Sequence, residues 1–144
     1  MVPDTIEREV VLRHPIERVW AALITAEGLS RWFGSVAEVD LRPGGRAYFR
    51  WEDLGQESVA TITAVEPPRR FAFRWGIEGL PANHELQTLV EFTLEQVPDG
   101  TRLRLVESGF AQAADDVAWS AHEANSQGWD AELVDLKTYL DAAA

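Results

Sequence analysis

Apolar and polar side chains alternate with a period of two between residues 46 and 107, and this alternation limits the fold more than any other feature. Successive side chains of a β-strand point to opposite faces of a sheet, so the two alternating sets define two faces. One set is apolar and largely aromatic, and ends in a carboxylate: Ala47, Phe49, Trp51, Phe71, Phe73, Trp75, Val90, Phe92, Leu94, Leu103, Leu105 and Glu107. The other set is charged: Arg46, Arg50, Arg74, Glu91, Glu95, Arg102 and Arg104. The pattern predicts an antiparallel sheet with one buried face and one face in water.

Turn-forming sequences separate the strands. They are "RPGG" at 42–45, "DLG" at 53–55, "EPPRR" at 66–70, "GIEGLPANHE" at 76–85 and "PDG" at 98–100. Asp99-Gly100 favours a tight hairpin, because glycine readily adopts a positive φ. We therefore expect strands at 5–13, 36–40, 46–52, 57–66, 69–76, 86–97 and 101–109.

Helical spacing appears on both sides of the sheet pattern. Pro15 opens one apolar segment, which predicts helices over 15–26 and 27–33, and a third helix is expected over 116–142. The third helix has an apolar stripe made of Trp129, Leu133, Leu136 and Leu140, with Asp130, Glu132, Asp135 and Lys137 mostly turned to water. Towards its N-terminus the stripe thins to Ala118, Ala121, His122 and Asn125. The small and polar side chains at this end of the stripe predict an open space between the helix and the sheet.

Composition restricts the classes of partner. The 144 residues favour one domain, 1–144, and the net charge of -11 would repel nucleic acid and anionic membranes. No apolar run approaches the roughly 18 residues of a membrane span, and the N-terminus does not have the pattern of a signal peptide, so we expect a cytoplasmic protein. The absence of cysteine excludes disulfides, thiolate metal sites and cysteine nucleophiles. The oligomeric state is open.

Six motifs occur in one order between Thr5 and Leu140: "VVLRHPIERVWAAL", "LSRWFG", "RPGGRAYFRW", "VEPPRRFAFRW", "VEFTLEQVPDGTRLRLVESGF" and "GWDAELVDLKTYL". Together they resemble the SRPBCC superfamily, which includes START-related and birch-pollen-allergen-like proteins. More closely, they resemble the branch named after the activator of heat-shock protein 90 ATPase homologue, which includes many bacterial proteins. The resemblance implies an α+β helix-grip fold, in which a curved antiparallel sheet wraps around a long C-terminal helix with a deep cavity between them.

The same resemblance places "EGLSRWFG" in a short helix near the opening of the sheet. Trp32 and Phe33 would there close one end of the core or line the cavity entrance. From strand parity we expect Phe49, Trp51, Phe73, Trp75 and Phe92 to line the cavity, with Trp32 and Phe110 near its opening. Glu107 and His122 are the expected polar points, since Glu107 shares the parity of Leu103 and Leu105 and His122 lies on the stripe of Trp129.

Three classes of function fit these residues. The first is binding of a small hydrophobic ligand, with no cofactor and no assigned reaction. The second is a small cyclase, isomerase or hydrolase that uses Glu107 and His122 as an acid/base pair on an apolar carbonyl compound. The third is a co-chaperone or protein-interaction module. A metal site is not expected, because His14, His84 and His122 do not have metal-ligand spacing.

Overall fold

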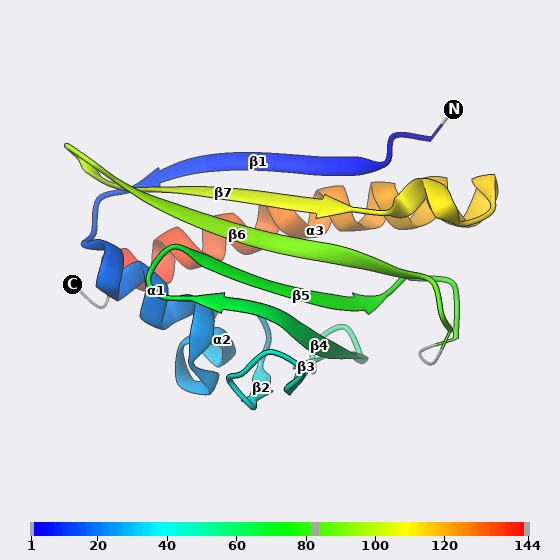
Figure 1. Ribbon diagram of the computed structural model, residues 1–144, viewed down its shortest axis with the longest axis horizontal. Helices are drawn as coiled ribbons and strands as arrows, with labels where there is room; N and C mark the ends of the chain where they lie inside the picture. The colour runs from blue at the N-terminus through cyan, green and yellow to red at the C-terminus, as the bar shows by residue number, and fades with distance from the viewer. Residues whose placement is uncertain (1, 82–83, 143–144) are drawn as a thin grey trace.

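The computed structural model describes residues 2–81 and 84–142, so the loop expected at 76–85 lies partly outside the described residues. Within these residues the chain forms a seven-stranded sheet, three α-helices and one short 3-10 helix (Figure 1). The elements follow in the order β1 (Thr5–Leu12), α1 (Ile16–Ile24), α2 (Ala26–Trp32), β2 (Val36–Val39), β3 (Arg46–Trp51), β4 (Gln56–Glu66), β5 (Arg70–Gly76), β6 (Gln87–Val97), β7 (Gly100–Ser108), η1 (Phe110–Gln112) and α3 (Asp115–Ala142). The expected strands are confirmed to within one residue at each end, whereas η1 was not predicted.

All neighbouring strands of the sheet are antiparallel, in the order β1-β7-β6-β5-β4-β3-β2. The two edge strands are β1 and β2, so the sheet is curved but does not close into a barrel. The tight β6–β7 hairpin depends on Gly100, whose φ of 141° is in the region that favours glycine. A Cβ atom at this position would lie 2.2 Å from the carbonyl oxygen of Leu12. The helix-grip fold expected from the sequence is confirmed.

The two faces of the sheet have the expected polarity. Phe49, Phe71, Phe73, Leu103 and Leu105 are buried on the inner face. The outer face carries ion pairs between neighbouring strands, such as Arg104 with Glu7 and Arg102 with Glu9 and Glu95. The inner face therefore supplies one wall of the core.

Helices α1 and α2 follow directly on one another and support the inner face. Val19 and Leu23 of α1 are fully buried. Helix α1 is shorter than the expected 15–26, because Thr25 takes an extended conformation and becomes the N-cap of α2. Its hydroxyl accepts a hydrogen bond from the backbone N–H of Gly28 at 3.0 Å, which satisfies one free donor at the start of α2. This junction brings Phe33, the residue after α2, into the core.

Helix α3 crosses the sheet, and its C-terminal end lies beside α1 (Figure 1). The Arg18 guanidinium donates to the carbonyl oxygen of Leu140 at 2.8 Å and joins these two helices. The buried part of the stripe consists of Trp129, Leu136 and Leu140, while Leu133 is only half-buried. No helix among the described residues is long and apolar enough to cross a membrane.

Candidate functional site

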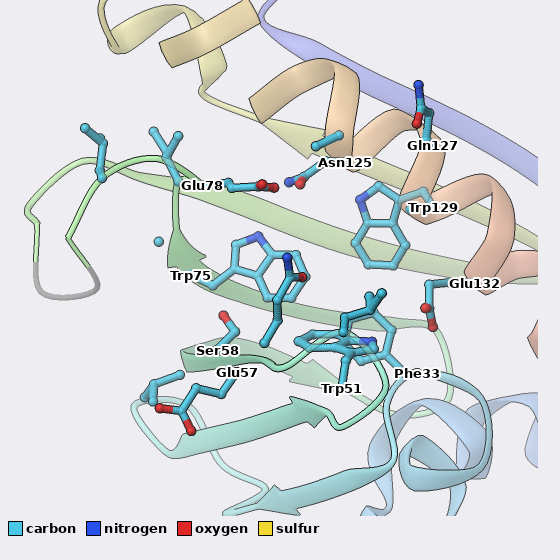
Figure 2. A pocket seen from close by; sticks show the side chains of 18 residues that line it. Phe33, Trp51, Glu57, Ser58, Trp75, Glu78, Asn125, Gln127, Trp129 and Glu132 are labelled. Carbon is cyan, nitrogen blue, oxygen red and sulfur yellow. The ribbon is translucent and has the colours of Figure 1, made fainter. Parts of the chain in front are cut away.

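A cavity of about 700 Å³ lies between the middle of α3 and the end of the sheet where β3 and β5 finish and β4 begins (Figure 2). Four aromatic side chains line it: Phe33, Trp51, Trp75 and Trp129. The remaining lining residues are Leu54, Gln56, Glu57, Ser58, Val59, Gly76, Ile77, Glu78, Leu80, Ala124, Asn125, Gln127, Gly128 and Glu132.

Phe33 is the centre of the aromatic cluster. Its ring stacks on those of Trp75 and Trp129, with centroid distances of 5.8 Å and 5.3 Å. It also meets Trp51 edge-on at 5.3 Å. These offset-stacked and edge-to-face geometries are the favourable ones for aromatic pairs. The cluster forms a packed apolar wall that joins α2, β3, β5 and α3.

Behind this wall lies Glu107 of β7, which is completely buried. Its carboxylate accepts hydrogen bonds from the indole nitrogens of Trp75 and Trp129, each at 2.8 Å. It also accepts from the hydroxyl of Thr88 at 2.5 Å and from the side-chain amide of Asn125 at 3.1 Å. A buried carboxylate needs such donors, since leaving it without partners is costly. Glu107 thereby fixes two of the cavity's tryptophans through their N–H groups.

Glu132 is the polar residue of α3 that lies directly against the aromatic wall (Figure 2). Its Oε2 is buried and has no hydrogen-bond partner among residues 2–81 and 84–142. Burial raises the pKa of Glu132 to about 7, the charges of Asp135 and Asp53 add to the rise, and the Trp51 side chain opposes it. The expectation that Glu132 turns to water is therefore wrong. Residue 132 is three positions after Trp129, and that helical spacing places it beside the stripe.

The space beside α3 lies farther along the helix than expected. Ala118 and Ala121 are fully buried, so the first part of the predicted thin face is filled. The lining residues of α3 begin with Ala124 and Asn125 and include Gly128. A Cβ atom added at Gly128 would meet no other atom within 4 Å. The cavity thus opens about one turn closer to the C-terminus than the sequence pattern indicated.

Comparison with known proteins gives the family. The family model described as activator of Hsp90 ATPase homolog 1-like protein matches residues 13–141. The chain belongs to this family. No protein with a curated description matches the chain.

Several solved structures share the fold of this member of the Hsp90 ATPase activator homolog 1-like family. Protein MLL2253 from Mesorhizobium loti is 26% identical and has a TM-score of 0.82 over 97% of this chain and 98% of that one. CalU16 from Micromonospora echinospora is 27% identical, with a TM-score of 0.69 over 94% and 73%. The Aha1 dimer from Colwellia psychrerythraea, 22% identical, has a TM-score of 0.74 over 92% of each chain, a likeness of fold. The fold is consistent with that of a ligand-binding domain.

In this family member, two of the expected site residues line the cavity, namely Trp51 and Trp75. Glu107 lies behind them and contacts the lining through hydrogen bonds. The other expected aromatic residues are buried in the core outside the lining: Trp32, Phe49, Phe73, Phe92 and Phe110. The indole of Trp32 donates to the carbonyl oxygen of Ala22 at 2.8 Å, which holds α2 on α1.

His122 and Glu107 are not brought together by a shared hydrogen bond. The Nε2 atom of His122 lies 2.9 Å from the carbonyl oxygen of Thr5 on the edge strand β1. Its ring meets that of Phe110 edge-on at 5.2 Å. The donors to Glu107 come instead from Trp75, Thr88, Asn125 and Trp129. Among the residues that the structure describes, no group of three or more His, Asp or Glu side chains has the arrangement of a metal site.

Three functional candidates were outside the expected set. Phe33 was expected to close one end of the core or to line the cavity entrance, and it lies at the centre of the aromatic lining. Gly128 and Glu132 lie one residue before and three residues after Trp129. Glu132 was detectable from helical spacing. Nothing in the sequence around Gly128 shows whether this glycine faces open space or is needed because another segment packs closely against it.

Proposed function

We propose that this chain binds a small hydrophobic molecule in the cavity between α3 and the sheet. The observation that carries the proposal is a space of about 700 Å³ walled by the rings of Phe33, Trp51, Trp75 and Trp129. Small-molecule sites are typically apolar concavities of roughly 300–1,000 Å³ with a few polar groups. The polar groups here are Asn125 and Glu132 from α3, and the acidic Glu78 opposite them (Figure 2).

The hydrogen bonds of Glu107 favour binding over acid/base catalysis. All of its described partners are donors, two of which are the indoles of the aromatic wall, and the ring of His122 is directed to the backbone of β1. In the proposed function Glu107 is a positioning residue and not a catalytic one. An enzyme that uses Glu107 and His122 together would require a rearrangement of both side chains.

The test uses a variant that fills the cavity. Gly128→Leu adds a side chain where a Cβ has no neighbour within 4 Å, so it should occupy binding space without disturbing the core. Ala131→Leu is the matched control, because Ala131 lies three residues later on the exposed side of the same helix. Both proteins would be titrated with a panel of flavonoids, sterols, fatty acids and aromatic amines. Binding would be followed by tryptophan fluorescence and by calorimetry.

We expect at least one compound class to quench the fluorescence of the wild-type protein and of Ala131→Leu. Gly128→Leu should bind the same compound at least about tenfold more weakly, since about 1.4 kcal/mol of lost contact is sufficient for that change. Equal affinity of Gly128→Leu and Ala131→Leu would show that the ligand binds elsewhere. No binding by any compound of the panel would contradict the proposed function.

A further inference from the structure

The charged groups of the cavity are all acidic. Glu57, Glu78 and Glu132 line it, and the described lining residues include no lysine, arginine or histidine. The carboxylate of Glu57 is directed to the outer face of the sheet, where it accepts a hydrogen bond from the hydroxyl of Tyr48 at 2.7 Å and where Glu57 is paired with Arg50. Glu78 and Glu132 are therefore the acidic groups that face the cavity. Asp53 and Asp135 lie close enough to Glu132 to act on it electrostatically. The field in the cavity therefore opposes anions such as fatty-acid carboxylates and favours cations.

The hydrogen-bonding groups around the aromatic wall are mainly acceptors. Asn125 directs its amide nitrogen to both oxygens of Glu107, which leaves its carbonyl oxygen as an acceptor. The carboxylate of Glu78 and the side chain of Asn125 point toward one another (Figure 2). The Oε2 atom of Glu132 is buried and has no partner among the described residues. An unpaired buried acceptor is unfavourable, so a ligand that donates a hydrogen bond there gains affinity.

The aromatic wall presents mainly ring surfaces, and the indole of Trp51 is the wall's donor toward Glu132, where its hydrogen bond lowers the pKa of that carboxyl. The indole N–H groups of Trp75 and Trp129 are both used by Glu107, on the side away from the cavity. The remaining π-surfaces of an indole attract cations as well as apolar rings. Glu107 thus removes two hydrogen-bond donors from the cavity. The ring surfaces and the carboxylates then both favour a ligand that is cationic and aromatic.

On these grounds, and resting on the proposed function, we infer that the ligand is an aromatic or polycyclic amine. Its ring system packs against Phe33, Trp51, Trp75 and Trp129, and its ammonium group donates to the free oxygen of Glu132. Glu78 and the carbonyl oxygen of Asn125 form a second acceptor pair for a hydroxyl or amino group on a longer ligand.

Three probes with the same ring and different charge test the inference. They are 2-naphthylmethylamine, which is a cation at neutral pH, the neutral 2-naphthylmethanol and the anionic 2-naphthoate. Each would be titrated calorimetrically into the wild-type protein at low and high salt. We expect the amine to bind at least about tenfold more tightly than the alcohol, as a charge-assisted hydrogen bond permits. The naphthoate should bind more weakly than both, and added salt should weaken the amine alone.

Two variants identify the residue responsible. Glu132→Gln removes the charge and keeps the shape, and Glu123→Gln makes the same change on an exposed part of α3 outside the cavity. Glu132→Gln should reduce the affinity for the amine about tenfold and leave that for the alcohol unchanged. Glu123→Gln should leave both affinities unchanged.

The outcomes separate the two proposals. If the alcohol binds as tightly as the amine, or if Glu132→Gln does not weaken the amine, the inferred ligand class is wrong and the proposed binding function stands. If the naphthoate is preferred, the inferred ligand class is also wrong. If none of the three probes binds and the wider panel is also negative, both proposals are overturned.

Discussion

At the scale of single residues, Glu107 is the unusual feature of this protein. A fully buried carboxylate is commonly balanced by a cation, and here it is held by two indoles, a hydroxyl and an amide. Hydrogen bonds to a charged group are stronger than those between neutral groups. Glu107 therefore orients Trp75 and Trp129 from behind, and each tryptophan contributes to the stability of the buried charge.

This arrangement predicts that Trp75→Phe and Trp129→Phe each lower the free energy of unfolding by roughly 2–4 kcal/mol. Each change removes one donor and leaves a buried charged oxygen short of a partner, which is costly. The measurement is chemical denaturation followed by circular dichroism. Trp20→Phe is the control, because its ring is buried and its indole makes no hydrogen bond among the described contacts. A loss for Trp20→Phe as large as that for Trp75→Phe would show that ring volume, and not the hydrogen bond, determines the effect.

Glu132 predicts a dependence of stability on pH. Its pKa is about 7 in the folded protein and the usual value is 4.5, so its ionisation opposes folding. The penalty is absent below the unfolded-state pKa, grows as the pH rises from about 4.5 to 7, and is complete above pH 7. Glu132→Gln should therefore become more stable than the wild type over this interval. After allowance for partial solvent screening, we expect a gain on the order of 1 kcal/mol at pH 8.

Thermal unfolding of the wild type and of Glu132→Gln between pH 4 and pH 9 measures the difference in stability between them. Glu123→Gln serves as the control on the exposed part of α3. The difference in stability between Glu123→Gln and the wild type should not change with pH in the same interval. If the difference in stability between Glu132→Gln and the wild type stays constant between pH 4.5 and pH 7, the ionisation of Glu132 does not cause it.

At the scale of elements, α3 combines two tasks. Its buried residues Trp129, Leu136 and Leu140 anchor it on the core, and Asn125, Gly128 and Glu132 face the cavity. Two neighbouring faces of one helix thus provide stability and the candidate site. Gly128 leaves room for a ligand, although glycine is a poor residue for the middle of a helix.

This placement predicts that Gly128→Ala raises the free energy of unfolding by about 0.5–1 kcal/mol, because alanine favours the helix and its Cβ meets open space. Gly28 of α2 is the matched comparison. A Cβ there would lie 2.8 Å from the Cα of Ala22, so Gly28→Ala should destabilise the protein despite its better helix propensity. The measurement is the denaturation midpoint of both variants. Destabilisation by Gly128→Ala would mean that the cavity at this point is filled.

At the scale of the whole molecule, the aromatic cluster joins elements that are distant in the sequence. Phe33 follows α2, Trp51 and Trp75 lie on the sheet, and Trp129 lies on α3. At the edge of the sheet, Arg8 of β1 contacts Asp130 of α3 at 2.7 Å, an exposed pair that contributes little by itself. The main attachment of α3 to the sheet is therefore through buried side chains such as Trp129.

We expect Trp129→Ala to lower the free energy of unfolding by about 3–5 kcal/mol, the usual range for truncation of a large core residue. The change removes contacts with Phe33, Trp75 and Phe92 together with one donor to Glu107. Calorimetric unfolding measures the loss. Asp130→Ala, at the next position, should change stability by less than about 1 kcal/mol, as is typical for an exposed ion pair. An unchanged midpoint for Trp129→Ala would mean that the helix is not anchored by this residue.

The antiparallel sheet, its two faces, its turns and the anchored C-terminal helix were determined by local features of the sequence. Strand parity is a property of the backbone itself, so Glu107 could be assigned to the inner face from its distance to Leu103 and Leu105. Helical spacing likewise identified the stripe of Trp129, Leu133, Leu136 and Leu140, of which all but the half-buried Leu133 are buried. The same spacing places Glu132, three residues after Trp129, beside the stripe.

Which inner residues line the cavity depends on how the elements pack together. Phe49, Phe73 and Phe92 share their parity with Trp51 and Trp75, and yet they are covered by neighbouring side chains. Whether a space stays open depends on the total volume of the side chains that the packed elements bring to it. The periodicity of the sequence carries no information about that total volume. The direction of His122 has a similar cause. His122 and Gly128 are six residues apart and so about 120° apart around α3, which directs His122 to the edge strand β1 and Gly128 to the cavity.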